Sequence, residues 1–117
     1  VIKYNSKNPE ALARYAEIAS FIGLTGDSHE ALRDALIAEL RAMNVALNIP
    51  LSIQNYGEGG LPAEKSIIDE KEFNDKLKNV AALAISDACT GSNPRIPTQE
   101  EMEKLLLAVY YDRDIDF

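Results

Sequence analysis

The chain has 117 residues, of which 46% are hydrophobic, which suits one domain with a core of its own but not two. Its formal net charge of −7 argues against a nucleic-acid or anionic-membrane surface, because both need clustered Lys and Arg. A single cysteine excludes an internal disulfide, and no apolar run approaches the roughly 20 residues of a membrane span. We therefore expect a cytoplasmic, soluble protein.

Two helices are predicted in the first half of the chain, after seven residues with no clear preference. Asn8 is a capping side chain followed by proline, and Gly23 ends this first helix. Asp27 begins the second helix with Glu30 at capping-box spacing, and Pro50 closes it. The second helix carries an apolar stripe of Leu32, Leu36, Leu40, Met43 and Leu47.

A loop and two more helices are predicted in the second half. Residues 57–66 hold three glycines and one proline and form the loop between helices. Asp69 caps a long helix, and Thr98 caps the last one, from about Gln99 to Tyr110, with Glu101 as its capping-box partner. The apolar stripes of these two helices are Phe73, Leu77, Val80, Ala84 and Ala88, and Met102, Leu105, Leu106 and Val109. No stretch alternates as a strand, so residues 1–117 are expected to form one all-α domain of about four to five helices.

The loop 87–98 is the most distinctive connection in the chain. Gly91 stands where a helix ending near Cys89 would need a left-handed residue. Pro94 and Pro97 force the residues before them out of the helical region, which makes the loop stiff.

Three polar side chains of this loop are candidates for a network that holds it shut. They are Asp87, Asn93 and Arg95, and we favour this structural role over direct contact with a substrate. Arg95 is a planar, permanently charged fork that suits carboxylates, carbonyls or a phosphate.

The same loop carries a resemblance to a known family. The run Asp-Ala-Cys-Thr-Gly-Ser-Asn-Pro-Arg at 87–95 resembles the C-terminal signature of the iron-containing (group III) alcohol dehydrogenases. The stretches 14–19, 48–53 and 105–114 agree with the family in order and spacing. The ending and the opening 1–5 are most similar to the alcohol dehydrogenase half of bifunctional aldehyde-alcohol dehydrogenases. The resemblance implies an incomplete C-terminal helical domain of a dehydroquinate synthase-like fold, and the absence of an initial methionine agrees with a fragment.

The resemblance also implies a function for the longer parent protein. The parent would interconvert a primary alcohol and its aldehyde with NAD(H), using Fe²⁺ or, alternatively, zinc as a Lewis acid on the substrate oxygen. This segment would supply no catalytic residue and no metal ligand, and alone it would be inactive. Cys89 and Thr90 would line the cleft for substrate and cofactor, although Cys89 could equally be a small buried thiol. The loop-structuring residues would be Asp87, Gly91, Asn93, Pro94 and Arg95.

The remaining candidates suit structural roles better than chemical ones. His29 is the only histidine, has no ligand partner at a known spacing, and is expected to point to solvent. Asp112, Asp114 and Asp116 are expected to be solvated near the end of the chain. The apolar side chains of this tail could dock against a neighbouring subunit or simply pack or fray; they are Tyr110, Tyr111, Ile115 and Phe117.

Two hypotheses about partners follow. In the first, the partner is the rest of the parent chain, and the isolated segment self-associates through apolar helix faces that this parent would cover. Candidates for such faces are Leu12, Tyr15, Leu77 and Leu106. The alternative is a free-standing acidic helical module that binds other proteins and has no catalytic activity. Neither hypothesis includes nucleic acid or a membrane.

Overall fold

The computed structural model describes residues 1–117 as helices and connecting segments, with no strand beyond one isolated bridge between Tyr56 and Pro62. The α-helices are α1 (Ile2–Asn5), α2 (Pro9–Phe21), α3 (His29–Ala46), α4 (Glu70–Ser86) and α5 (Gln99–Tyr111). Short 3₁₀ turns lie at η1 (Ile53–Asn55), η2 (Glu58–Gly60) and η3 (Thr90–Ser92). The predicted all-α class is confirmed. None of the helices combines the length and apolar character needed to cross a bilayer.

Most helix starts are formed by the predicted caps. The Asn8 carboxamide oxygen accepts hydrogen bonds from the backbone N–H groups of Glu10 and Ala11, which begin α2. Asp69 accepts from the N–H of Glu72 at 2.9 Å to begin α4. Thr98 and Glu101 form the reciprocal capping box of α5.

The predicted ends of α3 are shifted at both sides. Ser28, not Asp27, is the cap, because its extended backbone (φ −150°) lets its hydroxyl accept from the N–H of Ala31. The helix ends at Ala46, before Pro50. Asn48 then takes the left-handed conformation (φ 58°), and the N–H of Ile49 bonds back to the Asn44 carbonyl.

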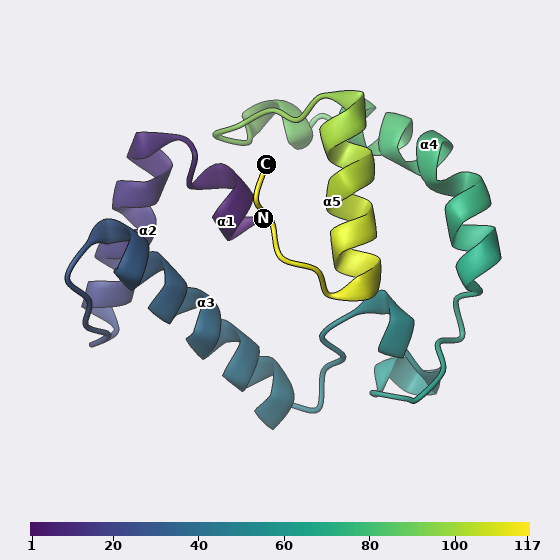
Figure 1. The fold of residues 1–117 in the computed structure, drawn as a ribbon, viewed down its shortest axis with the longest axis horizontal. Coiled ribbons are helices and arrows are strands. Elements are labelled where there is room, and N and C mark those ends of the chain that lie inside the picture. The colour runs from purple at the N-terminus through teal and green to yellow at the C-terminus, as the bar shows by residue number, and fades with distance from the viewer.

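The helices form two halves that meet along a narrow junction (Figure 1). In the first half α2 packs against α3, with Ala11, Ala16, Ala19 and Leu36 buried. In the second half α4 packs against α5, and the ring of Tyr110, only 2% exposed, lies 4.4 Å from that of Phe73 between centroids. The tail after α5 runs back between the halves to α1 (Figure 1). Tyr4 of α1, 1% exposed, is therefore buried where the two halves join.

The apolar stripes are covered over only part of their length. In α3, Leu36 is buried, but Leu40, Met43 and Leu47 are exposed. In α4 the buried residue is Ala81, while Val80 and Ala88 are exposed. In α5, Ala108 and Tyr110 are buried and Val109 is exposed. The four residues proposed as uncovered, Leu12, Tyr15, Leu77 and Leu106, are instead partly covered.

Candidate functional site

The loop 87–98 begins one turn earlier than its sequence suggests. The helix α4 ends at Ser86, and Asp87 after it has an extended backbone (ψ 133°). The Asp87 carboxylate accepts a hydrogen bond from the N–H of Cys89 at 2.8 Å. The Thr90 hydroxyl donates to the carbonyl of Ala84 at 2.6 Å, which ties the turn back to the helix. The prediction that Gly91 is left-handed is therefore wrong: the Asp87 turn has already ended the helix, and Gly91 lies inside η3 with a negative φ.

Asn93 joins this loop to the opposite half of the molecule. Its carboxamide and that of Asn5 exchange two hydrogen bonds, at 2.7 and 2.9 Å, and its amide nitrogen also donates to the Arg95 carbonyl. Asn5 is buried in α1, and its amide also donates to the Tyr15 hydroxyl. The carbonyl of Pro94 accepts from Asn8, the cap of α2. The loop is thus held against both α1 and α2.

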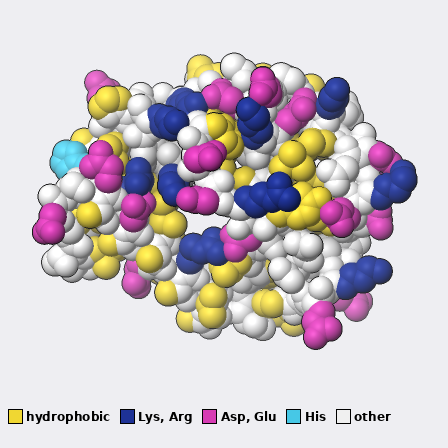
Figure 2. Space-filling view, in the orientation of Figure 1, with side chains coloured by type: hydrophobic (Ala, Val, Ile, Leu, Met, Phe, Trp, Pro, Cys, Tyr) yellow, Lys and Arg dark blue, Asp and Glu magenta, His cyan; other side chains and the backbone are white.

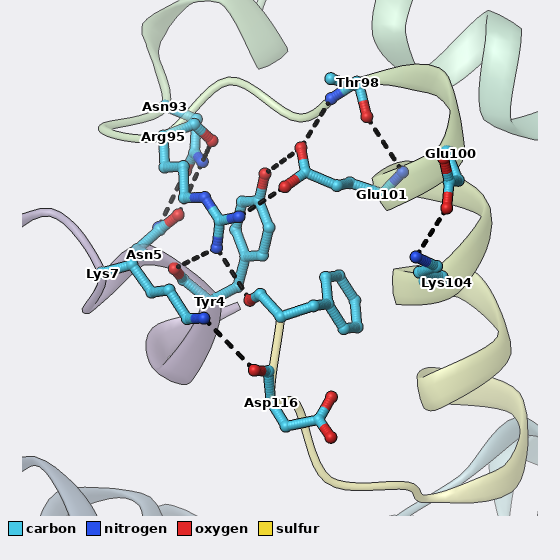
Figure 3. A network of polar contacts seen from close by, with 11 residues as sticks. Tyr4, Asn5, Lys7, Asn93, Arg95, Thr98, Glu100, Glu101, Lys104 and Asp116 are labelled. Atoms are coloured by element: carbon cyan, nitrogen blue, oxygen red, sulfur yellow. Dashed lines mark hydrogen bonds and ion pairs between the residues drawn. The ribbon is translucent and has the colours of Figure 1, made fainter.

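Arg95 is the centre of the polar network at this junction (Figure 3). One guanidinium nitrogen donates to the backbone carbonyls of Tyr4 (3.3 Å) and Phe117 (2.9 Å), and the other forms an ion pair with Glu101. The guanidinium carbon also lies 3.8 Å from the centroid of the Tyr4 ring, in cation–π geometry. Arg95 therefore connects loop, α1, α5 and tail through a single side chain.

The network changes the protonation equilibria of its two acids. The pKa of Glu101 is lowered from its ordinary value, first by the hydrogen bond from the Thr98 N–H and also by the Tyr4 hydroxyl and the charge of Arg95. The pKa of the Tyr4 hydroxyl is raised, first by burial and then by its hydrogen bond to Glu101. A charged Glu101 with a neutral Tyr4 is therefore the favoured state at neutral pH.

The tail is held in place by ion pairs. Asp112 has a left-handed backbone at the end of α5 (φ 53°). Its carboxylate accepts hydrogen bonds from two guanidinium nitrogens of Arg41 in α3, one of them at 2.8 Å. Asp114 pairs with Lys3, whose hydrogen bond lowers the pKa of that carboxyl, as do the N–H of Ile115 and the charge of Lys3. The expectation that these aspartates are only solvated is wrong for both, because the tail turns back over basic residues of α1 and α3.

The aromatic residues of the tail also contact the chain itself. Tyr110 is core, and its hydroxyl donates to the Ile68 carbonyl. The Phe117 ring lies 6.1 Å from that of Tyr4 between centroids. Of the two roles considered for this segment, packing within the chain accounts for both side chains.

A groove of about 550 Å³ lies next to the network, along α5, and it is also lined by the loop 87–98, the tail and Arg41 of α3. Its lining is mostly apolar and includes Leu105, Leu106 and Val109 of α5. Cys89 and Thr90 lie on the same lining, so the structure brings the two predicted cleft residues together. The Cys89 side chain is exposed, which contradicts its interpretation as a buried thiol. Figure 2 shows the molecule hollowed between its halves, with hydrophobic and charged side chains around the hollow.

Metal ligands are not gathered at the groove or elsewhere in the chain. No three side chains from His, Cys, Asp and Glu lie close enough to hold a metal ion. His29 is the first residue of α3 and is exposed, beside a separate shallow pocket that also includes Phe21.

Comparison with known proteins identifies the family. The model of the Fe-containing alcohol dehydrogenase family, C-terminal, matches residues 1–110. The chain belongs to this family. It is 42% identical over its full length to the NADPH-dependent butanol dehydrogenase of Clostridium saccharobutylicum, of which it covers 27%. It is 34% identical over 129 aligned positions to the bifunctional aldehyde-alcohol dehydrogenase AdhE of Escherichia coli, covering 97% of the chain and 13% of that protein.

This family member therefore spans about a quarter of the butanol dehydrogenase and about an eighth of AdhE. The predicted resemblance to iron-containing alcohol dehydrogenases, including the bifunctional kind, is confirmed. No three His, Cys, Asp or Glu side chains of this chain lie close enough together to hold the iron in the family's name.

Asp87, Asn93 and Arg95 could be predicted from the sequence, but the residues of α1 that Asn93 and Arg95 contact could not. Asn5 and Tyr4 lie in the opening segment for which no structure was predicted, 88 and 91 positions from their partners. The only available signal was that polar Asn5 and Tyr4 belong to one of the family-like stretches. Asp87 bonds within its own turn and takes no part in the wider network.

Proposed function

We propose that this chain is the C-terminal helical portion of a longer, iron-dependent alcohol dehydrogenase that interconverts a primary alcohol and its aldehyde. The nicotinamide cofactor was expected to be NAD(H), although one relative carries NADPH in its name. The segment itself would contribute one wall of the active-site cleft, at the Cys89 and Thr90 end of the groove. Metal and dinucleotide would be bound by other parts of the longer protein.

The observation that supports this proposal most is that a family motif and an apolar groove coincide. The family model covers the loop 87–98, and this loop places Cys89 and Thr90 on the lining of the groove. A mostly apolar lining with a few polar groups is typical of sites for small organic molecules. The hydroxyl of Thr90 donates a hydrogen bond to the Ala84 carbonyl, which ties this part of the wall to the end of α4.

The proposal is tested first on the protein as its natural source produces it. Its intact mass shows whether a longer chain contains this segment, and the purified protein is assayed with iron, a series of primary alcohols, and NAD⁺ or NADP⁺ separately. We expect alcohol-dependent reduction of one dinucleotide by the longer protein and none by residues 1–117 alone. A natural protein of only these residues, or a longer one without this activity, contradicts the proposal.

Variants of the loop test the assignment of the cleft wall. Thr90→Val and Cys89→Ala in the longer protein should each raise the KM for the alcohol by several-fold, because they change the lining of the cleft. Ser92→Ala is the matched control, since Ser92 lies in the same 3₁₀ turn but is absent from the lining. Equal kinetics for all three variants would remove these residues from the cleft.

The alternative of a free-standing interaction module finds support only in the exposed apolar side chains. It predicts that the natural protein ends where this chain ends and captures other proteins. The family match over residues 1–110 favours the dehydrogenase portion instead.

A further inference from the structure

A buried polar contact joins α1 to the loop 87–98. The carboxamides of Asn5 and Asn93 exchange two hydrogen bonds, and the Asn5 side chain is almost completely shielded from water. Two other polar residues of the chain are buried as well, Ser6 and Ser52, but their side chains bond to residues at most four positions away. Asn5 is therefore the one buried polar side chain that bonds to a residue distant in sequence.

This pair fixes the position of the loop more than it adds stability. Replacing two bonded polar groups by apolar groups of the same shape is often nearly neutral for the free energy of unfolding. Hydrogen bonds are directional, however, so a reciprocal pair permits a single placement of Asn93 relative to Asn5. A displaced loop would leave the buried Asn5 amide without this partner, at a cost in free energy.

The pair is connected to the proposed cleft wall through the backbone. The N–H of Asn93 donates to the carbonyl of Thr90 at 3.2 Å, within the same 3₁₀ turn. The hydroxyl of Thr90 is bonded to the end of α4, so the turn that carries Cys89 and Thr90 is held from α4 on one side and from α1 on the other. Asn5 is absent from the lining of the groove, so it can act on the cleft only through Asn93.

We infer that Asn5 is a positioning residue for the binding of the alcohol. Its carboxamide holds Asn93, and through Asn93 it holds the turn of Cys89 and Thr90 where the alcohol binds. This inference rests on the proposed function, in which these two residues line the active-site cleft. Loss of the pair lets the turn shift while the helices on either side stay in place.

The first test is the kinetics of the longer protein, supplied with iron and its dinucleotide. Asn5→Ala should raise the KM for the alcohol about tenfold and change kcat less than about twofold, because the wall binds the alcohol but supplies no reacting group. Tyr110→Phe is the matched control, since Tyr110 is also 2% exposed, loses one hydrogen bond and lies outside the lining. The control should lower the Tm and leave the KM unchanged. An equal KM for the two variants would overturn the inference.

A double variant shows whether Asn5 acts through the turn. In the Thr90→Val background, Asn5→Ala should raise the KM less than about twofold further, whereas independent effects would multiply. Multiplied effects would overturn the inference. If Asn5→Ala does not fold, Asn5→Ser takes its place in every measurement, because it keeps a polar group at this buried position while its shorter side chain does not reach Asn93.

Hydrogen–deuterium exchange of the longer protein gives a readout that does not need catalysis. The backbone N–H groups of Thr90, Ser92 and Asn93 are bonded within the turn. They should exchange about tenfold faster in Asn5→Ala than in Tyr110→Phe, because the turn opens more often without the pair. Equal exchange would overturn the inference. A longer protein without alcohol dehydrogenase activity would overturn the proposed function, whereas an active one with an unchanged KM in Asn5→Ala overturns this inference alone.

Discussion

Arg95 makes contacts that a lysine could not reproduce. Its fork reaches two backbone carbonyls and the Glu101 carboxylate while its plane covers the Tyr4 ring. The pair with Glu101 is only about a quarter exposed, 23% and 24% for the two side chains, so it is less screened than the surface pairs of this chain. A lysine would offer one point charge in place of a planar donor set.

Arg95→Lys should therefore destabilise the chain although the charge is kept. We expect a loss of about 2 kcal/mol in the free energy of unfolding, because hydrogen bonds from a charged donor are lost and carbonyls stay partly buried. Urea denaturation of residues 1–117 measures it. Arg14→Lys is the control, since the exposed Arg14–Glu17 pair should contribute less than about 0.5 kcal/mol. Equal losses for the two variants would show that Arg95 is not central.

Glu101 should make stability depend on pH in the acid range. Its pKa is lower in the folded chain than its ordinary value of 4.5, so it stabilises the fold fully above that value. This contribution is lost as the pH falls from about 4.5 through the lowered folded pKa. Glu101→Gln should flatten this part of the curve of unfolding free energy against pH, whereas Glu64→Gln, in the loop 57–66, should not. A Glu101→Gln curve as steep as that of the unmodified chain would contradict the assignment.

At the level of the helix, the structure shows which of two neighbouring residues caps the start of α3, a choice that the sequence alone did not decide. Asp27 and Ser28 are both good caps, and the capping-box spacing to Glu30 favoured Asp27. The structure uses Ser28, whose hydroxyl accepts from the N–H of Ala31 at 3.1 Å. The choice of cap depends on the direction in which the chain enters the helix after Gly26, and the spacing of residues in the sequence does not determine that direction.

Alanine substitutions test this start directly. Ser28→Ala should cost about 1 kcal/mol of unfolding free energy, because an N–H at the helix start loses its acceptor. Asp27→Ala should change it by less than about 0.5 kcal/mol, as for other exposed sites without a specific contact. Thermal or urea unfolding of the two variants measures the difference. A larger loss of unfolding free energy for Asp27→Ala than for Ser28→Ala would show that Asp27 is the cap.

Caps and periodicity predicted the helices well, but they did not predict what covers them. Each of the three correctly predicted caps accepts a hydrogen bond from a backbone N–H two or three residues further on, so the local sequence is enough to predict it; these caps are Asn8, Asp69 and Thr98. The stripe of α3 was also read correctly as apolar, yet Met43 and Leu47 remain exposed. A stripe shows which face of a helix is apolar, whereas its covering depends on segments distant in sequence. The same limit explains why Arg95 was named as a network residue while Tyr4 and Asn5 were not.

At the level of the whole molecule, two helical halves are joined through the Arg95 network and the tail, and each keeps apolar side chains in water. The most exposed of them is Phe21, 92% exposed at the end of α2, with Ile18 and Ile22 half exposed beside it in sequence. This cluster lies outside the lining of the groove along α5. We expect the isolated chain to associate through this cluster.

Residues 1–117 alone should self-associate through this cluster at high concentration, despite the net charge of −7, because burying Phe21 removes a large apolar side chain from water. Sedimentation equilibrium over a concentration series should show an average mass above 12.9 kDa that rises with concentration. Phe21→Asp should return the mass to that of the monomer, whereas Val80→Asp, which adds the same charge at an exposed site on α4, should not. A monomer at all concentrations would contradict self-association. Loss of association in both variants would assign it to net charge rather than to this face.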